Sequence, residues 1–248
     1  MPYLTRPAGA TTSAVAVGVG VPGYAHPLVA PVEWAELTRP GIPLHWAALN
    51  VSNGPGIQPD PHCLAAAGRL RNTGATVLGH LDLARGTRPF AELIRDVHRY
   101  ADWYRVGGFL LDRCPAEPGA LPAVRRLAGA LRALVPGAHL VLLHGRHPDP
   151  GYAGIADQLV TFAGSWGDYR WSQAAEWTAA YPAGKFCHFV HGIPRGHLEE
   201  ALRIARWQGA ATVFFTDRTQ LRGGASPWEA MPGYWDDLVS LIGRGVSE

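Results

Sequence analysis

Aspartate side chains stand where several short apolar segments of the sequence end. Asp112 follows the run Gly107-Gly108-Phe109-Leu110-Leu111, and Asp82 and Asp217 close two comparable runs. A carboxylate carried on the rigid end of a strand can act as a general acid, as a nucleophile or as a stabiliser of positive charge. We therefore predict catalytic roles for Asp112, Asp217 and Asp82. An ion pair is the alternative for each, and for the last two it is equally plausible.

Histidines and other hydrogen-bonding residues collect at the same segment ends. The sequence His80-Leu81-Asp82 places two types of metal ligand on one face of a strand. No local metal-binding motif accompanies them, so we expect hydrogen-bonding histidines and neither a metal nor another cofactor. Trp228 could stack on a sugar ring, but its spacing is more typical of a core residue. The predicted substrate-binding residues are Tyr24, His26, Asn50, Asn53, His80, Arg113, His144, His188 and His191.

Short apolar runs alternate with amphipathic segments along the whole chain. Runs that are apolar throughout are typical of parallel strands buried on both faces. The predicted strands are Ala14–Val21, Leu44–Asn50, Thr76–Asp82, Gly108–Asp112, His139–His144, Gln158–Ala163, Phe186–His191 and Thr212–Asp217. The predicted helices are Asp60–Thr73, Pro89–Tyr104, Leu121–Val135, Trp171–Tyr181, Leu198–Gln208 and Trp228–Ile242. The connection from His144 to Gln158 is too short and too rich in Pro and Gly for a full helix.

Eight strand–helix units in 248 residues predict an α/β fold, a single-domain (β/α)8 (TIM) barrel. We place the barrel at residues 14–245, after an N-terminal extension of residues 1–13. A doubly wound open sheet is the main alternative. That fold carries a glycine-rich phosphate loop after an early strand, whereas Gly18-Val19-Gly20 lies inside a predicted strand. In a barrel, the strand-end residues named above meet at one mouth.

Composition narrows the classes of partner. The net charge is only +2 and the 22 basic residues are dispersed, so neither nucleic acid nor a membrane surface is an expected partner. No apolar run approaches the roughly 20 residues of a membrane-spanning helix. The three cysteines, Cys63, Cys114 and Cys187, are far apart and do not suggest a disulfide framework. Because the N-terminal apolar run is also a poor signal peptide, we expect a cytoplasmic protein.

The strand-end motifs, taken in order, resemble those of the spherulin-4-like (spherulation-specific family 4) proteins. This group is related to barrel glycoside hydrolases that act on galactosamine-containing polysaccharides. The resemblance covers nearly the whole chain, and it implies the same barrel fold and a glycan ligand. The matching stretches are Val21–Pro27, Trp34, Asn50–Gly56, Val77–His80, Tyr100-X-X-Trp103-Tyr104, Gly107–Asp112, Thr161–Ser165, His191-Gly192 and Phe215–Asp217.

Two acidic positions of the resembling hydrolases differ in this sequence. Those enzymes carry an Asp-Glu pair at the end of the fourth strand and another Glu after the sixth. Here the pair reads Asp112-Arg113 and the later position is Ala163. Glycoside hydrolysis ordinarily needs two groups, one to protonate the leaving oxygen and one to act on the anomeric carbon. Asp82, Asp217, a histidine or an N-acetyl group of the substrate could serve as the second.

We predict a glycoside-hydrolase-like barrel that acts on an amino-sugar-containing glycan, with Asp112 as its retained acidic residue. Two other functions stay open. One is a barrel enzyme repurposed for a small, anionic substrate through Asp112, Arg113 and the histidines, because a guanidinium favours an anionic ligand. The other is a carbohydrate-binding barrel that has lost its catalysis.

Overall fold

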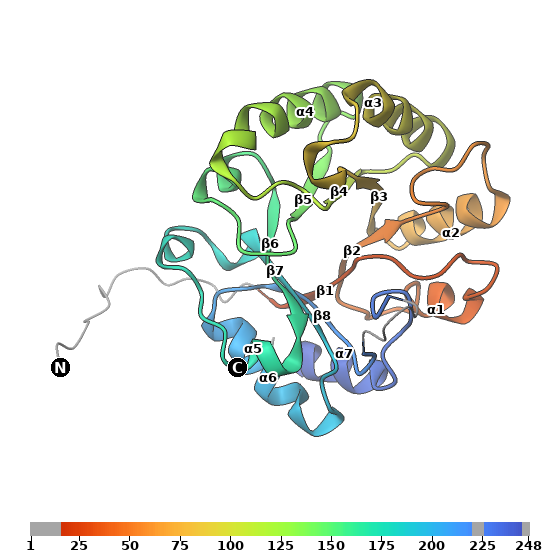
Figure 1. Cartoon of the computed structure of the whole chain (residues 1–248). Helices are drawn as coiled ribbons and strands as arrows, with labels where there is room; N and C mark the ends of the chain where they lie inside the picture. Colours follow the sequence, from red (N-terminus) through yellow and green to blue (C-terminus); the bar gives the residue numbers. More distant parts are fainter. Residues whose placement is uncertain (1–15, 220–225, 245–248) are drawn as a thin grey trace.

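Eight parallel strands close into a barrel in the computed structural model, which describes residues 16–219 and 226–244 (Figure 1). Each strand pairs with the next along the chain, and the last pairs with the first. The predicted (β/α)8 barrel is therefore confirmed, and the open-sheet alternative is excluded. Residues 14 and 15 of the first predicted strand, the extension 1–13 and residue 245 lie outside the described residues. The strands are β1 (Gly18–Val21), β2 (Leu44–Leu49), β3 (Thr76–Asp82), β4 (Gly108–Asp112), β5 (His139–Leu143), β6 (Gln158–Ser165), β7 (Phe186–His191) and β8 (Thr212–Phe215).

Helices surround the strands (Figure 1). The helix α3 (Phe90–Arg99) continues as a π-helical turn, Tyr100–Tyr104, and the connection between β5 and β6 holds only a 3-10 helix, Pro150–Gly154. The reduced helix predicted at that connection is confirmed. No helix in the described part of the chain has the length and apolar character needed to cross a bilayer. The helices are α1 (Pro31–Glu36), α2 (Pro61–Asn72), α3 (Phe90–Arg99), α4 (Leu121–Leu134), α5 (Trp166–Tyr169), α6 (Leu198–Trp207) and α7 (Trp235–Arg244).

Two helix predictions were wrong. The segment Trp171–Tyr181 holds only a 3-10 helix, Glu176–Ala180, because its aromatic residues do not share a helix face: Trp171 is 81% exposed, whereas Trp177 packs on Tyr181. The last helix begins at Trp235 rather than Trp228. The intervening Pro232 disfavours helical backbone at the residue before it.

The barrel interior is filled by side chains near the amino ends of the strands. The Trp46 indole N–H donates to Gln158 Oε1 (2.7 Å), and Gln158 in turn donates to Thr212 Oγ1 (2.9 Å). A Cβ atom at Gly20 would lie 2.6 Å from the Trp46 ring, so the glycine makes room for the indole. A Cβ atom at Gly18 would likewise overlap the His45 ring, so packing explains both glycines of β1.

Candidate active site

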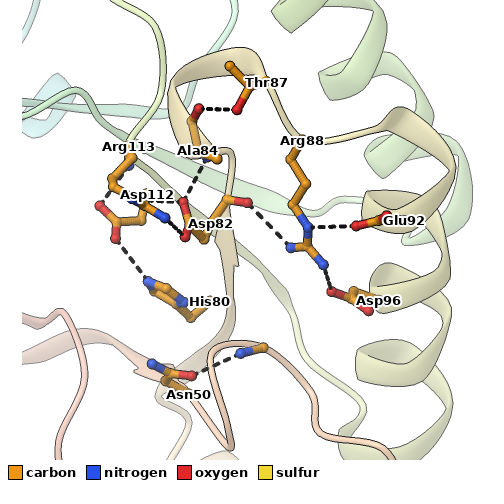
Figure 2. A network of polar contacts seen from close by, with 11 residues as sticks. Asn50, His80, Asp82, Ala84, Thr87, Arg88, Glu92, Asp96, Asp112 and Arg113 are labelled. Atoms are coloured by element: carbon orange, nitrogen blue, oxygen red, sulfur yellow. Dashed lines mark hydrogen bonds and ion pairs between the residues drawn. The ribbon is translucent and has the colours of Figure 1, made fainter.

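The ends of β3 and β4 bring a histidine and two aspartates to the barrel mouth. Asp82 pairs with Asp112 in the strand register, and His80 pairs with Leu110. Paired residues of parallel strands point to the same side, so His80, Asp82 and Asp112 share the inner face. The Nε2 atom of His80 lies 3.2 Å from Asp112 Oδ2 (Figure 2). A carboxylate only accepts hydrogen bonds, so Nε2 carries the proton, while the buried Nδ1 of His80 has no partner among the described residues.

Arg113 binds Asp82 across the two strands rather than extending into the mouth alone. Its Nε donates to Asp82 Oδ1 (2.7 Å), and its Nη2 donates to the other carboxylate oxygen (Figure 2). Ala84 N donates to the same carboxylate (2.7 Å). Burial opposes ionisation of Asp82, but these donors outweigh it and hold the pKa of the Asp82 carboxyl below its ordinary value. Asp82 is therefore a fixed anion that neutralises Arg113.

The loop after β3 is held by a second ionic network. Arg88 donates to the buried Asp96 and to the backbone oxygen of Asp82, and it also pairs with Glu92 (3.6 Å), as Figure 2 shows. Ala84, Arg85 and Arg113 have positive φ angles of 46°, 55° and 47°. Such strain persists only where neighbouring structure enforces it, and it clusters at functional sites. These contacts fix the loop that borders Asp112.

A pocket of about 240 Å³ opens at the carboxyl ends of β4 to β7. Asp112 is the one carboxylate among its described lining residues. A larger cavity of about 350 Å³ lies at the other end of the barrel, beside the starts of β2 and β3. The smaller pocket is the candidate site, because the polar residues at the strand ends line it. It is lined by Arg85, Asp112, Arg113, Leu143, His144, Gly145, Ala163, Gly164, His191 and Trp228.

Two histidines of the pocket are uncharged hydrogen-bonding groups. His144 Nδ1 lies 2.7 Å from the Pro115 carbonyl oxygen and must donate to it, which leaves Nε2 as an acceptor. Burial lowers the pKa of His144 to about 4, and Nε2 has no partner among the described residues. Burial also lowers the pKa of His191, although the Asp168 charge opposes this. The ring of His191 lies 5.6 Å from that of Trp228.

A bulge in β6 sets which residues of that strand face the pocket. The register shifts between Val160 and Phe162, after which Phe162 pairs with His188 and Ala163 with Phe189. Ala163 consequently shares the inner face with Phe189 and lines the pocket. A β-bulge is a common device for re-aiming side chains beside a site. Here it presents a methyl group, so β6 contributes no acid at this position.

Two of the predicted site residues lie away from the pocket on neighbouring strands. His188 is buried against α5, with Nδ1 2.7 Å from Tyr169 Oη and Nε2 3.1 Å from Thr161 Oγ1. Burial lowers its pKa to about 3. Asp217 accepts a hydrogen bond from Gly233 N (2.9 Å) and thereby holds the segment before α7. The hydrogen bonds of His188 and Asp217 are made with residues that support the barrel, and neither side chain lines the pocket.

The other predicted binding residues build the loops of the rim. Tyr24 is buried against Trp34 and Phe214. Asn50 Oδ1 accepts from Gly54 N (3.0 Å), and Asn53 is exposed in that turn with a φ of 48°. His26 contacts Asp60 and Cys63. The structure thus brings together Asp112, Arg113, His144 and His191, with His80 and Asp82 in direct contact with this group.

Two residues of the site region escaped the sequence analysis. Arg85 lines the pocket from a left-handed turn, and no motif marks it. Asp168, at the start of α5, accepts from Ser165 Oγ (2.6 Å) and lies close enough to influence His191. The sequence Ser165-Trp166-Gly167-Asp168 is a helix-capping pattern, which could have located Asp168 at a strand end. Trp228, expected in the core, also reaches the pocket lining.

The closed barrel with a polar pocket at the carboxyl ends of its strands defines the class of (β/α)8-barrel proteins. Within this class, the chain belongs to spherulation-specific family 4, whose sequence profile matches residues 18–242. No curated protein sequence is significantly similar to it.

Solved structures share the fold. Sph3 from Aspergillus clavatus, in complex with GalNAc, is 23% identical with a TM-score of 0.78, over 92% of this chain and 98% of that chain. A variant of the glycoside hydrolase domain of PelA from Pseudomonas aeruginosa is 16% identical with a TM-score of 0.53, over 81% and 96%. The catalytic domain of the major endoglucanase from Xanthomonas campestris pv. campestris is 13% identical with a TM-score of 0.56, over 94% of each chain.

Proposed function

We propose that this protein binds an N-acetylated amino sugar of a glycan in the pocket at the ends of β4 to β7. The observation that carries the proposal is the pocket itself, where one carboxylate stands among neutral histidines and an indole. Membership of spherulation-specific family 4 and the GalNAc complex of Sph3 support a sugar ligand. At about 240 Å³ the pocket is below the roughly 300–1,000 Å³ of drug-sized sites, which suits a single sugar residue.

The polar groups of the pocket match the chemistry of an N-acetylhexosamine. The Asp112 carboxylate, 28% exposed, is an acceptor, and a sugar offers hydroxyl and acetamido N–H donors to it. Trp228 offers a ring face for the C–H side of a pyranose. Arg85 borders the same space and offsets the charge of Asp112, whereas Arg113 is neutralised by Asp82. The pocket therefore has no excess negative charge to attract a free amine, which favours a neutral, acetylated amino sugar.

Two-carboxylate hydrolysis has little support in this geometry. The general acid of such a reaction needs a raised pKa, whereas the pKa of Asp82 is lowered, and both its oxygens receive N–H groups of Arg113. Asp217 is occupied by Gly233, and Ala163 takes the place of an acid on β6. Binding without cleavage is thus the function that we favour.

Calorimetric titration with N-acetylgalactosamine tests the binding. We expect saturable binding by the wild type and an affinity about fivefold lower in Trp228→Ala, because an aromatic stacking contact contributes on the order of 1 kcal/mol. Trp207→Ala, at an exposed tryptophan of α6, is the matched control and should bind like the wild type. Absence of saturable binding, or equal affinity in Trp228→Ala, would contradict the proposal.

Incubation with an N-acetylgalactosamine-containing polysaccharide distinguishes binding from hydrolysis. We expect no new reducing ends from the wild type. Cleavage that is lost in Asp112→Asn and retained in Asp217→Asn would instead identify Asp112 as a catalytic acid. The amide oxygen introduced by Asp217→Asn can still accept the hydrogen bond from Gly233, which makes this substitution a conservative control.

A second candidate function rests on the Asp112–His80 pair. The 3.2 Å contact couples a carboxylate to an imidazole at the mouth, as an acid/base pair requires. Such a pair could serve a repurposed enzyme with a small substrate held near Arg113. Turnover of small carboxylate or phosphate esters that disappears in both His80→Gln and Asp112→Asn would favour this function over binding alone.

A further inference from the structure

His26, Asp60 and Cys63 form a cluster on the rim of the barrel, outside the pocket. His26 lies in the loop after β1, whereas Asp60 caps α2 and Cys63 belongs to its first turn. His26 Nε2 is 3.3 Å from Asp60 Oδ1 and 3.3 Å from Cys63 Sγ. One ligand atom of each side chain lies within 4.8 Å of the other two. We propose that these three residues bind a divalent transition-metal ion, Zn²⁺ in the first instance.

The two separations from His26 Nε2 fit tetrahedral zinc. Zinc bond lengths of about 2.0–2.1 Å to His and 2.3 Å to Cys place tetrahedral N and S ligands about 3.6 Å apart, and N and O ligands about 3.3 Å apart. The observed separations of 3.3 Å from Nε2 to both partners are within a few tenths of an ångström of these values. The ligand atoms of Asp60 and Cys63 lie within 4.8 Å of each other.

The donor set selects the class of metal. An imidazole nitrogen, a thiolate and a carboxylate together suit a borderline ion such as Zn²⁺, whereas Mg²⁺ and Ca²⁺ prefer oxygen ligands alone. His26 and Asp60 are 26% and 27% exposed, so the ion can enter from solvent. Three protein ligands leave the fourth tetrahedral position to water or to a further side chain. His62 is adjacent, with its ring 6.2 Å from that of His26.

Surrounding hydrogen bonds orient the ligands. Asp60 Oδ1 accepts from Cys63 N (2.8 Å), and Asp60 N donates to Tyr104 Oη (2.9 Å), which fixes the start of α2. His26 Nδ1 accepts from Leu28 N (3.2 Å), so its proton resides on Nε2. On binding, the ion displaces the thiol proton to the buffer and the imidazole proton moves to Nδ1. The hydrogen bond from Leu28 N is then lost, because Nδ1 has become a donor.

A nucleophilic Cys–His site is a poorer interpretation of the same cluster. Asp60 contacts the nitrogen of His26 that faces the thiol, rather than the opposite nitrogen that an orienting carboxylate would engage. A metal ion, in contrast, uses all three groups at once and ties the β1 loop to α2.

Titration of the metal-stripped protein with Co²⁺ and with Zn²⁺ tests the proposal. We expect one equivalent of Co²⁺ to give the intense near-ultraviolet thiolate-to-metal absorption, and Zn²⁺ to displace it. Cys63→Ala should abolish this absorption, and His26→Gln should weaken Zn²⁺ binding by more than about 100-fold, because loss of outer-shell groups alone costs 10–100-fold. Cys114→Ala, at a buried cysteine elsewhere, is the matched control and should bind like the wild type.

Circular dichroism of each variant establishes that it is folded before the titration. Zn²⁺ should raise the Tm of the wild type and of Cys114→Ala but not that of Cys63→Ala. Absence of thiolate absorption in the folded wild type, or its persistence in folded Cys63→Ala, would overturn the proposal. Neither result would bear on sugar binding in the pocket, which uses other residues.

Discussion

Acidification should destabilise this protein through His188, a histidine buried between β7 and α5. In the folded protein burial lowers its pKa from 6.5 to about 3. Between these values the unfolded chain binds a proton that the folded protein does not, so stability falls as the pH falls below about 6.5. At pH 5 the expected loss relative to pH 7.5 is about 2 kcal/mol, and below pH 3 it approaches about 5 kcal/mol.

Urea unfolding of the wild type and of His188→Gln at the two pH values measures this contribution. Glutamine does not titrate, and it can keep one of the hydrogen bonds to Tyr169 or Thr161. We expect the wild type to lose about 2 kcal/mol more than His188→Gln between pH 7.5 and pH 5, since the remaining titrating groups are common to both. His98→Gln, at an exposed histidine of α3, should behave like the wild type. An equal loss in the wild type and His188→Gln would refute the reasoning.

Three further substitutions test the barrel and the site. Gly108→Ala should lower the free energy of unfolding by at least about 2 kcal/mol in urea, because its Cβ would lie 2.0 Å from a backbone oxygen of β5. Arg88→Gln should cost about 3 kcal/mol, because it leaves the buried Asp96 only a 3.9 Å contact with Arg95, and Arg88→Gln/Asp96→Asn should recover part of that loss. Arg113→Met should raise the pKa of Asp82 in a carboxyl NMR titration, because its guanidinium donors are removed. If the free energy of unfolding or the pKa of Asp82 did not change, the role given to the corresponding contact would be wrong.

The strands and their closure into a barrel could be predicted from the sequence because the signal is local. A parallel strand covered on both faces is apolar throughout, and three predicted strands, Thr76–Asp82, Gly108–Asp112 and Phe186–His191, have the bounds that the structure shows. The number of strand–helix units then allows few architectures. The predicted helix bounds were wrong at the β6–β7 connection. There Trp177 packs on Tyr181, and only the 3-10 helix Glu176–Ala180 forms.

By itself the sequence determined which strand ends carry polar residues, and only the tertiary structure decided which of these residues meet. His188 and His191 lie three residues apart on one strand, so they point to opposite faces, but only the fold shows that the first faces α5 and the second the pocket. The pairing of Arg113 with Asp82 spans 31 residues, and no local pattern encodes it. Such contacts depend on strand register and on the β6 bulge, which are set by packing throughout the closed barrel.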